Sequence, residues 1–321
     1  MLNAWIVFQR MLVLSALMVI GYFSYKKGIL EKISYSHLSR LVISIMNPLL
    51  IIDGVLGKES TPGNALRQNL FFTILYFVIL ILLSFPVAGI LRVKKSEGYL
   101  YRLMLIFSNV GFMGIPVITS LYGENCVLYI AFYILAYNLL LYTYGLILVN
   151  KSVAHDENSS ERLLHKEDSS PKKGIALFIN PGVIACVIAI AVFAFRIPVP
   201  DPAMQLIHSL GNCAVPLSMI LIGASMAQQK FKSLLTDPKM YLYLAIRMLV
   251  IPLTAAFVLR HFSFDRQVTG VFGMMLAMPI GSIVVLLANG QGADETLCTR
   301  GSVISTLASV ITIPLIAAFL P

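Results

Sequence analysis

Charged residues are scarce in this chain. They make up 12% of its 321 residues, whereas hydrophobic residues make up 58%. A typical soluble domain carries roughly 25% charged residues, and a soluble fold could not keep so much apolar side chain away from water. Disordered chains are poor in apolar residues, so the same composition excludes disorder. The composition therefore predicts a polytopic membrane protein.

Other absences narrow the function. The four cysteines form no CxxC pair and have no histidine at metal-ligand spacing, which predicts inert buried thiols rather than a disulfide framework or a metal site. No GxxxxGK[ST] sequence occurs, which argues against intrinsic ATP-driven pumping. No span holds an Asp pair, HExxH or GxSxG, so we predict neither an enzyme nor a cofactor. No removable signal peptide is expected at the N-terminus.

Long apolar runs are abundant, and a helix needs about 20 residues to cross a bilayer core. Because the runs lack the strict alternation of a membrane barrel, we predict α-helices. Ten runs qualify: residues 3–25, 38–56, 69–91, 103–122, 126–150, 176–195, 206–227, 240–261, 268–290 and 301–320.

The basic residues predict the topology. The loops after spans one, three, five, seven and nine hold 17 Lys and Arg, and the opposite loops hold five. The positive-inside rule therefore puts both termini outside and the central linker in the cytoplasm. The net charge of +9 is explained by these short clusters, so no nucleic-acid partner is expected. The predicted location is the cell (inner) membrane.

The chain divides near its middle. We predict a first unit of five spans over residues 1–150, a polar cytoplasmic linker over 151–175 and a second unit of five spans over 176–321. An odd number of spans starts the second unit on the opposite side, so a structural repeat would be inverted. Prolines support it weakly: Pro48 pairs with Pro216, and Pro116 pairs with Pro279. Paired helix breaks are the best sequence pointer to a transporter site.

These motifs resemble the auxin efflux carrier family of membrane transporters. The resemblance is carried by Asn109-Val-Gly-Phe-Met-Gly-Ile-Pro116, Tyr122-Gly123, Asn47-Pro48-Leu49, Asn180-Pro181 and Ala277-Met278-Pro279, in order along the whole chain. It implies ten helices in two inverted five-helix repeats, with broken helices four and nine crossing as in bile-acid and sodium/proton transporters. It also implies transport of small carboxylate anions. Plant carriers have a second proline near Val284, so here the break in span nine depends on Pro279, Gly281 and Ser282.

Polar residues within the spans are the candidate binding residues. Asn109 leads, because an amide beside a helix break can donate to a carboxylate next to a helix N-terminus. Asn47, Asn138, Asn212 and Ser282 either line the same cavity or bond to neighbouring helices. Gly111 and Gly114 are expected to allow close backbone approach, and Pro116, Pro279 and Gly281 to form the breaks.

Two charged residues within the spans are candidates for coupling or charge pairing. Asp53 could carry a proton or simply reach interfacial water, and Arg247 could neutralise a substrate or extend to the cytoplasm, which we favour. Proton or sodium coupling and a homodimer both stay open.

The sequence therefore favours a secondary transporter that exports or exchanges small organic anions. A cation/proton exchanger would need carboxylates at the crossing of spans four and nine, and these spans have none. An anion channel remains an alternative, since amides and carbonyls can line a pore.

Overall fold

A computed structural model describes residues 4–54, 56, 63–123, 126–156, 181–228, 237–261 and 264–320. These residues are largely helical, which confirms the prediction of a helical protein. Within these ranges no strand forms, and most of the predicted linker lies outside them. The helices and π-helical turns (η) are α1 (Ala4–Lys26), α2 (Lys32–Leu41), η1 (Val42–Met46), α3 (Asn47–Asp53), α4 (Gly63–Ile90), α5 (Lys95–Ile106), η2 (Val110–Gly114), α6 (Ile115–Tyr122), α7 (Val127–Leu140), η4 (Leu141–Gly145), α8 (Leu146–Ala154), α10 (Pro181–Phe195), α11 (Asp201–Ala227), α13 (Pro238–Ala245), η6 (Ile246–Val250), α14 (Ile251–Leu259), α15 (Arg266–Ala277), α16 (Ser282–Gln291) and α17 (Glu295–Phe319).

Six described helical stretches are long and apolar enough to cross a membrane: Ile33–Asp53, Arg67–Ile90, Tyr129–Ala154, Asp201–Ala227, Pro238–Leu259 and Glu295–Phe319. They coincide with predicted spans two, three, five, seven, eight and ten. Predicted spans four and nine are interrupted, and the described part of span six begins at Pro181. A membrane protein is therefore supported, and the count of ten stays a prediction.

Aspartates start three of the helices. Asp237, Asp265 and Asp294 are the N-cap residues of α13, α15 and α17, and each side chain accepts a hydrogen bond from a backbone N–H of the first turn. This is the expected use of Asp, because those N–H groups have no partner within the helix. At the other end of a helix, Gly123 ends α6 with a φ of 79°, a conformation that favours glycine.

The prolines do not break every helix that holds them. Three π-helical turns stand directly before an X-Pro pair: η1 before Pro48, η2 before Pro116 and η6 before Pro252. A proline lacks the N–H for the usual bond and crowds the carbonyl four residues earlier, and a widened turn accommodates both effects. Pro216 lies inside α11 without a break. Pro48 and Pro216 therefore lie within continuous helical stretches and do not interrupt them.

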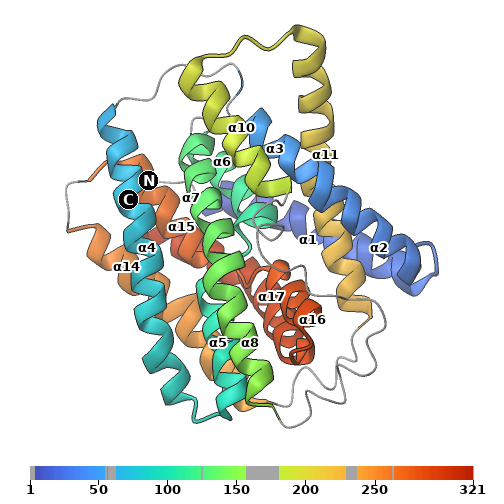
Figure 1. The fold of residues 1–321 in the computed structure, drawn as a ribbon, viewed down its shortest axis with the longest axis vertical. Helices are drawn as coiled ribbons and strands as arrows, with labels where there is room; N and C mark the ends of the chain where they lie inside the picture. Colours follow the sequence, from blue (N-terminus) through green and yellow to red (C-terminus); the bar gives the residue numbers. More distant parts are fainter. Residues whose placement is uncertain are drawn as a thin grey trace.

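The described helices form two groups, which contact each other where α1 packs against α17. In one group α11 packs against α1, α2 and α3, and α3 packs against α10; in the other, α5 packs against α4, α8 and α17 (Figure 1). The contact of α1 with α11 depends on two glycines. A Cβ on Gly21 would lie 1.9 Å from the Ile220 carbonyl oxygen, and one on Gly223 would lie 1.8 Å from that of Met18. Only glycine lets the two backbones approach so closely.

Candidate functional site at the paired helix breaks

The two interrupted spans meet at their breaks. After α5 ends, residues 107–109 are not helical and η2 begins after them; after α15 ends, residues 278–281 are not helical and α16 begins after them. The two segments pair antiparallel through a bridge between Ser108 and Ile280. The Asn109 N–H donates to the Pro279 carbonyl over 2.7 Å, and the Gly281 N–H donates to the Phe107 carbonyl over 3.0 Å.

The break in the first of these spans differs from the sequence prediction. It lies at Phe107–Asn109, whereas Gly111 and Gly114 are in the π-helical turn and Pro116 is in the first turn of α6. The reason is that a proline in the first helical turn removes an N–H that has no helical partner anyway, so it is tolerated there.

In the second span the unwound segment contains both Pro279 and Gly281, and Val284 is helical. A Cβ on Gly281 would lie 3.0 Å from both the Ser108 carbonyl oxygen and the Tyr137 hydroxyl. This tight fit explains a glycine at the crossing.

Side chains from other spans bind the backbone groups that the breaks release. The Ile280 N–H donates to the Ser305 hydroxyl over 3.0 Å, and the Ser302 hydroxyl donates to the Ile280 carbonyl over 3.3 Å. Both serines belong to α17. In a bilayer interior no water is available for such groups, so each must find a partner within the protein. The hydroxyls of α17 thus make the break in the second span tolerable.

Arg247 ties the two breaks together. Its Nε donates to the Met104 carbonyl over 3.1 Å, its Nη1 to the Met278 carbonyl over 2.8 Å and its Nη2 to the Ser108 hydroxyl over 2.9 Å. Only 3% of the residue is exposed. The favoured interpretation, that this side chain extends to the cytoplasm, is therefore wrong, because three acceptors at the crossing hold it inside.

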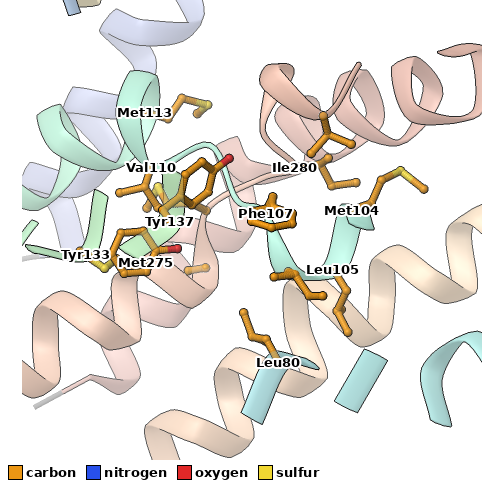
Figure 2. Close-up of a cluster of buried hydrophobic side chains, with 14 of the residues drawn as sticks. Leu80, Met104, Leu105, Phe107, Val110, Met113, Tyr133, Tyr137, Met275 and Ile280 are labelled. Carbon is orange, nitrogen blue, oxygen red and sulfur yellow. The ribbon is translucent and has the colours of Figure 1, made fainter. Parts of the chain in front are cut away.

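Apolar side chains surround the crossing. Figure 2 shows Phe107 in the unwound segment, with Tyr137 on one side and Ile280 and Met104 on the other. The rings of Phe107 and Tyr137 meet edge to face at 5.3 Å between centroids. Phe107, Met104 and Ile280 are fully buried. Dense packing around the paired segments leaves them little freedom to move independently.

A cavity opens beside the crossing. It encloses about 840 Å³, including the part that is open to the outside. The lining residues come from α3, the two unwound segments, η2, α6, α7, η4, α10 and α16: Asn47, Ile51, Ser108, Asn109, Val110, Gly111, Ile115, Ile134, Tyr137, Asn138, Tyr142, Pro181, Gly281, Ser282 and Ile283. None of these side chains is acidic or basic, so the wall is neutral and largely apolar.

Four of the five predicted binding residues line this cavity, namely Asn47, Asn109, Asn138 and Ser282. Asn109 is 3% exposed, and its Nδ2 has no hydrogen-bond partner among the described residues. Asn138 donates from Nδ2 to the Ile134 carbonyl of its own helix over 2.9 Å. The Asn47 Nδ2 lies beside Gly111, 3.8 Å from where a Cβ would stand. The cavity thus gathers amides from three separate spans.

Two helix N-termini also face this cavity. Val110 and Gly111, which begin η2, and Ser282 and Ile283, which begin α16, are among its lining residues. The N–H groups of a first helical turn have no partner within the helix and together carry about half a positive charge. Two such ends beside a buried amide donor give a wall without charged side chains a positive potential, which suits the binding of an anion.

Asn212 and Asp53 lie outside the cavity lining. Asn212 is exposed on α11, and its Nδ2 lies 3.0 Å from Nε2 of His208. The Nδ1 of His208 lies 3.0 Å from Oδ2 of Asp53, at the end of α3. With the amide donating to Nε2, the Nδ1 proton is directed at the carboxylate. His208 lies two turns inside α11, since that helix begins at Asp201.

Three polar residues of the cavity were missed from the sequence: Ser108, Tyr137 and Tyr142. Ser108 stands directly before Asn109, and a second polar residue next to the motif was an available signal. The two tyrosines gave no such signal, because aromatic residues are common in apolar spans.

A second cavity adjoins the first at the start of α16. Hydroxyl-bearing residues dominate its polar lining: Tyr35, Ser39, Ser218, Ser225, Ser282, Thr299, Ser302 and Thr306. Ser282 and Ile283 line both cavities, so the two cavities adjoin at the first turn of α16.

Comparison with known proteins agrees with this architecture. The chain matches the family model described as membrane transport protein over residues 6–317. It is 24% identical over 311 residues to an uncharacterized transporter of Methanothermobacter thermautotrophicus, with 96% of each chain covered. A match over nearly the whole chain fits a single transporter unit and confirms the resemblance of its motifs. The chain belongs to the membrane transport protein family, that is, the auxin efflux carrier family.

Proposed function

We propose that this membrane transporter is a secondary transporter of small organic anions, which binds a carboxylate at the paired breaks. The observation that carries the proposal is the buried Asn109 amide, unpartnered among the described residues, in a cavity that also receives two helix N-termini. An amide and backbone N–H groups can bind an anion without the tight ion pair that a lone buried arginine would form. Release, which transport requires, is therefore favoured as well as binding.

The lining supports a small organic anion with a compact charged group. Asn109, Asn47, Asn138 and Ser282 supply the hydrogen-bonding groups for a carboxylate, and isoleucine and tyrosine side chains supply the apolar wall. Pockets of this kind typically combine an apolar surface with a few polar groups that fix orientation. We therefore include both short carboxylates and aromatic carboxylates as candidate substrates.

The transport mechanism we propose is alternating access across the first turn of α16. Support comes from the two cavities, which adjoin at Ser282 and Ile283 in that turn. The proposed framework is ten spans in two inverted five-span repeats, 1–150 and 176–321, joined by the linker 151–175. The two interrupted spans pair through equivalent unwound segments, as expected for such repeats. Movement of one helix group past the other would expose Asn109 to each side in turn.

Two alternatives make different predictions. A cation/proton exchanger needs carboxylates at the crossing, and the cavity lining contains none. A channel conducts without saturable exchange. We also propose that the carrier couples transport to a proton or sodium ion and that it forms a homodimer. We propose that it lies in the inner membrane with its central linker in the cytoplasm. Asp53 is the proposed coupling carboxylate, because His208 lies within hydrogen-bonding distance of it.

The proposal is tested by substrate exchange in proteoliposomes. Proteoliposomes that contain the purified protein are loaded with malate, malonate, another short dicarboxylate or an aromatic carboxylate. Exchange of the radiolabelled compound across their membrane is then measured. Asn109→Ala is compared with Asn212→Ala, which removes the same side chain outside the cavity lining. We expect saturable exchange that Asn109→Ala reduces by about tenfold or more, the effect of losing one hydrogen bond to a charged group. Asn212→Ala should leave the exchange rate within about twofold of the wild-type rate.

Each result has a distinct meaning. Equal loss in both variants, or none in Asn109→Ala, would remove the crossing as the substrate site. Conductance without saturation would favour the channel, and no exchange by folded protein across the panel would reject carboxylates as substrates.

A further inference from the structure

Arg247 is a buried cation without an acidic partner. In the described part of the chain no carboxylate pairs with it, and its three hydrogen-bond acceptors are the neutral oxygens of Met104, Met278 and Ser108. A cation inside a membrane protein is expensive unless something compensates its charge. The question is therefore what balances Arg247.

The partial charges of helix ends supply the balance. Met104 lies in the last turn of α5, and Met278 is the C-cap residue of α15. Each helix C-terminus carries about half a negative charge, so two of them together amount to roughly one, which matches the guanidinium. The opposite ends at the crossing are the starts of η2 and α16, whose two N-termini together amount to roughly one positive charge. These line the cavity with no acidic side chain in its wall.

We propose that Arg247 gives the substrate site its selectivity for anions, by cancelling the two helix C-termini so that the two N-termini set the potential in the cavity. The proposal rests on the proposed function. Arg247 is a positioning residue, since it reaches the cavity only through Ser108, whose hydroxyl accepts from Nη2 over 2.9 Å and which lines the cavity. The substrate anion is then the missing counter-charge of the crossing.

The charge of Arg247 should act over a short path. An anion that touches Ser108 would lie roughly 6 Å from the guanidinium, and at an effective dielectric constant of about 20 removal of a unit charge at 6–10 Å weakens a monoanion's binding by about twenty- to hundredfold. Because Coulomb energy is proportional to ligand charge, the logarithm of the loss should double for a dianion and vanish for a neutral ligand.

The test uses three ligands of nearly equal shape: malonate as the dianion, malonamate as the monoanion and malonamide as the neutral compound. Competition of each with exchange of the best carboxylate substrate is measured at neutral pH in proteoliposomes. The variants are Arg247→Gln and Arg247→Met, which remove the charge, and Arg247→Lys, which keeps it. Arg260→Gln is the matched control, because that arginine is exposed at the end of α14. Two neutral variants are made so that the test can still be carried out if one of them does not fold.

We expect the neutral variants to lose affinity in the order dianion, monoanion, neutral compound, with the last changed by less than about twofold. Arg247→Lys should restore most of the affinity for both anions, and Arg260→Gln should match the wild type. An equal loss of affinity for all three ligands would show that Arg247 only holds the fold. Unchanged affinities in the neutral variants would show that its charge does not act on the ligand. Either result overturns this inference and leaves the proposed function standing. If the wild-type protein exchanges no carboxylate at all, the proposed carboxylate function fails and the inference fails with it.

Discussion

Ser305→Ala offers a sharp test of how the second break is tolerated. Ser305 is fully buried in α17, and its hydroxyl accepts the hydrogen bond of the Ile280 N–H over 3.0 Å. Alanine would leave that N–H without its acceptor in a site with no bulk water. The hydroxyl's own donation, to the Ser302 carbonyl, would be lost too, but Thr306 also donates to that oxygen. The main effect is therefore one orphaned backbone donor.

The size of the effect follows from the burial. An orphaned buried N–H costs about 1–3 kcal/mol of the free energy of unfolding. With a slope of about 2 °C per kcal/mol for a large chain, the melting temperature should fall by about 2–6 °C. Backbone hydrogen exchange should also rise at Ile280, since local opening would no longer break a hydrogen bond.

The assay is thermal unfolding of the purified protein in detergent, with hydrogen exchange on the segment that contains Ile280. Ser209→Ala is the matched control, because that hydroxyl is exposed and bonds only to the Gln205 carbonyl of its own helix. We expect the control to stay within about 1 °C of the wild type, as most exposed substitutions do. If Ser305→Ala unfolds at the same temperature as the control, with unchanged exchange at Ile280, the account of the break is refuted.

Two further predictions concern the contact between α1 and α11 and the Asp53–His208 pair outside the cavity lining. Gly223→Ala should destabilise the protein by about 1–3 kcal/mol in thermal unfolding, because the new methyl group meets the Met18 carbonyl at 1.8 Å. Gly89→Ala, where a Cβ meets nothing within 4 Å, is the control, and equal effects would contradict the close contact. Asp53→Asn should reduce uptake driven by a proton gradient several-fold while leaving exchange at equal pH unchanged, because exchange needs no net proton movement. Loss of both activities would instead assign Asp53 a structural role.

The motif around Asn109 shows how far sequence reasoning reached. A polar residue beside glycines and a proline in an apolar run predicted an interrupted span, and the span is interrupted. The position was misplaced toward Pro116 because a proline that begins a helix looks in sequence like one that ends it. Pro48 and Pro216 show the same ambiguity, since both lie within continuous helical stretches.

Arg247 and Asn212 show where sequence reasoning ended. Both are polar residues in apolar runs, and nothing local separates their roles. Arg247 is buried because Met104, Ser108 and Met278, which are far from it in the chain, provide its acceptors. Asn212 turns instead toward His208 on the outside of α11. Which face a helix presents to the cavity depends on its rotation within the bundle, and that is set by packing against other spans.

The sequence by itself determined the helical membrane fold, the interrupted spans and the family, because apolar length, helix-breaking residues and ordered motifs are properties of the chain taken segment by segment. Only the tertiary structure decided that Phe107–Asn109 pairs with Met278–Gly281, that Arg247 joins them and that Asn47, Asn109 and Asn138 line one cavity. Backbone groups released from a helix inside a membrane must find partners in distant spans, and those partners follow from the packing of the whole bundle.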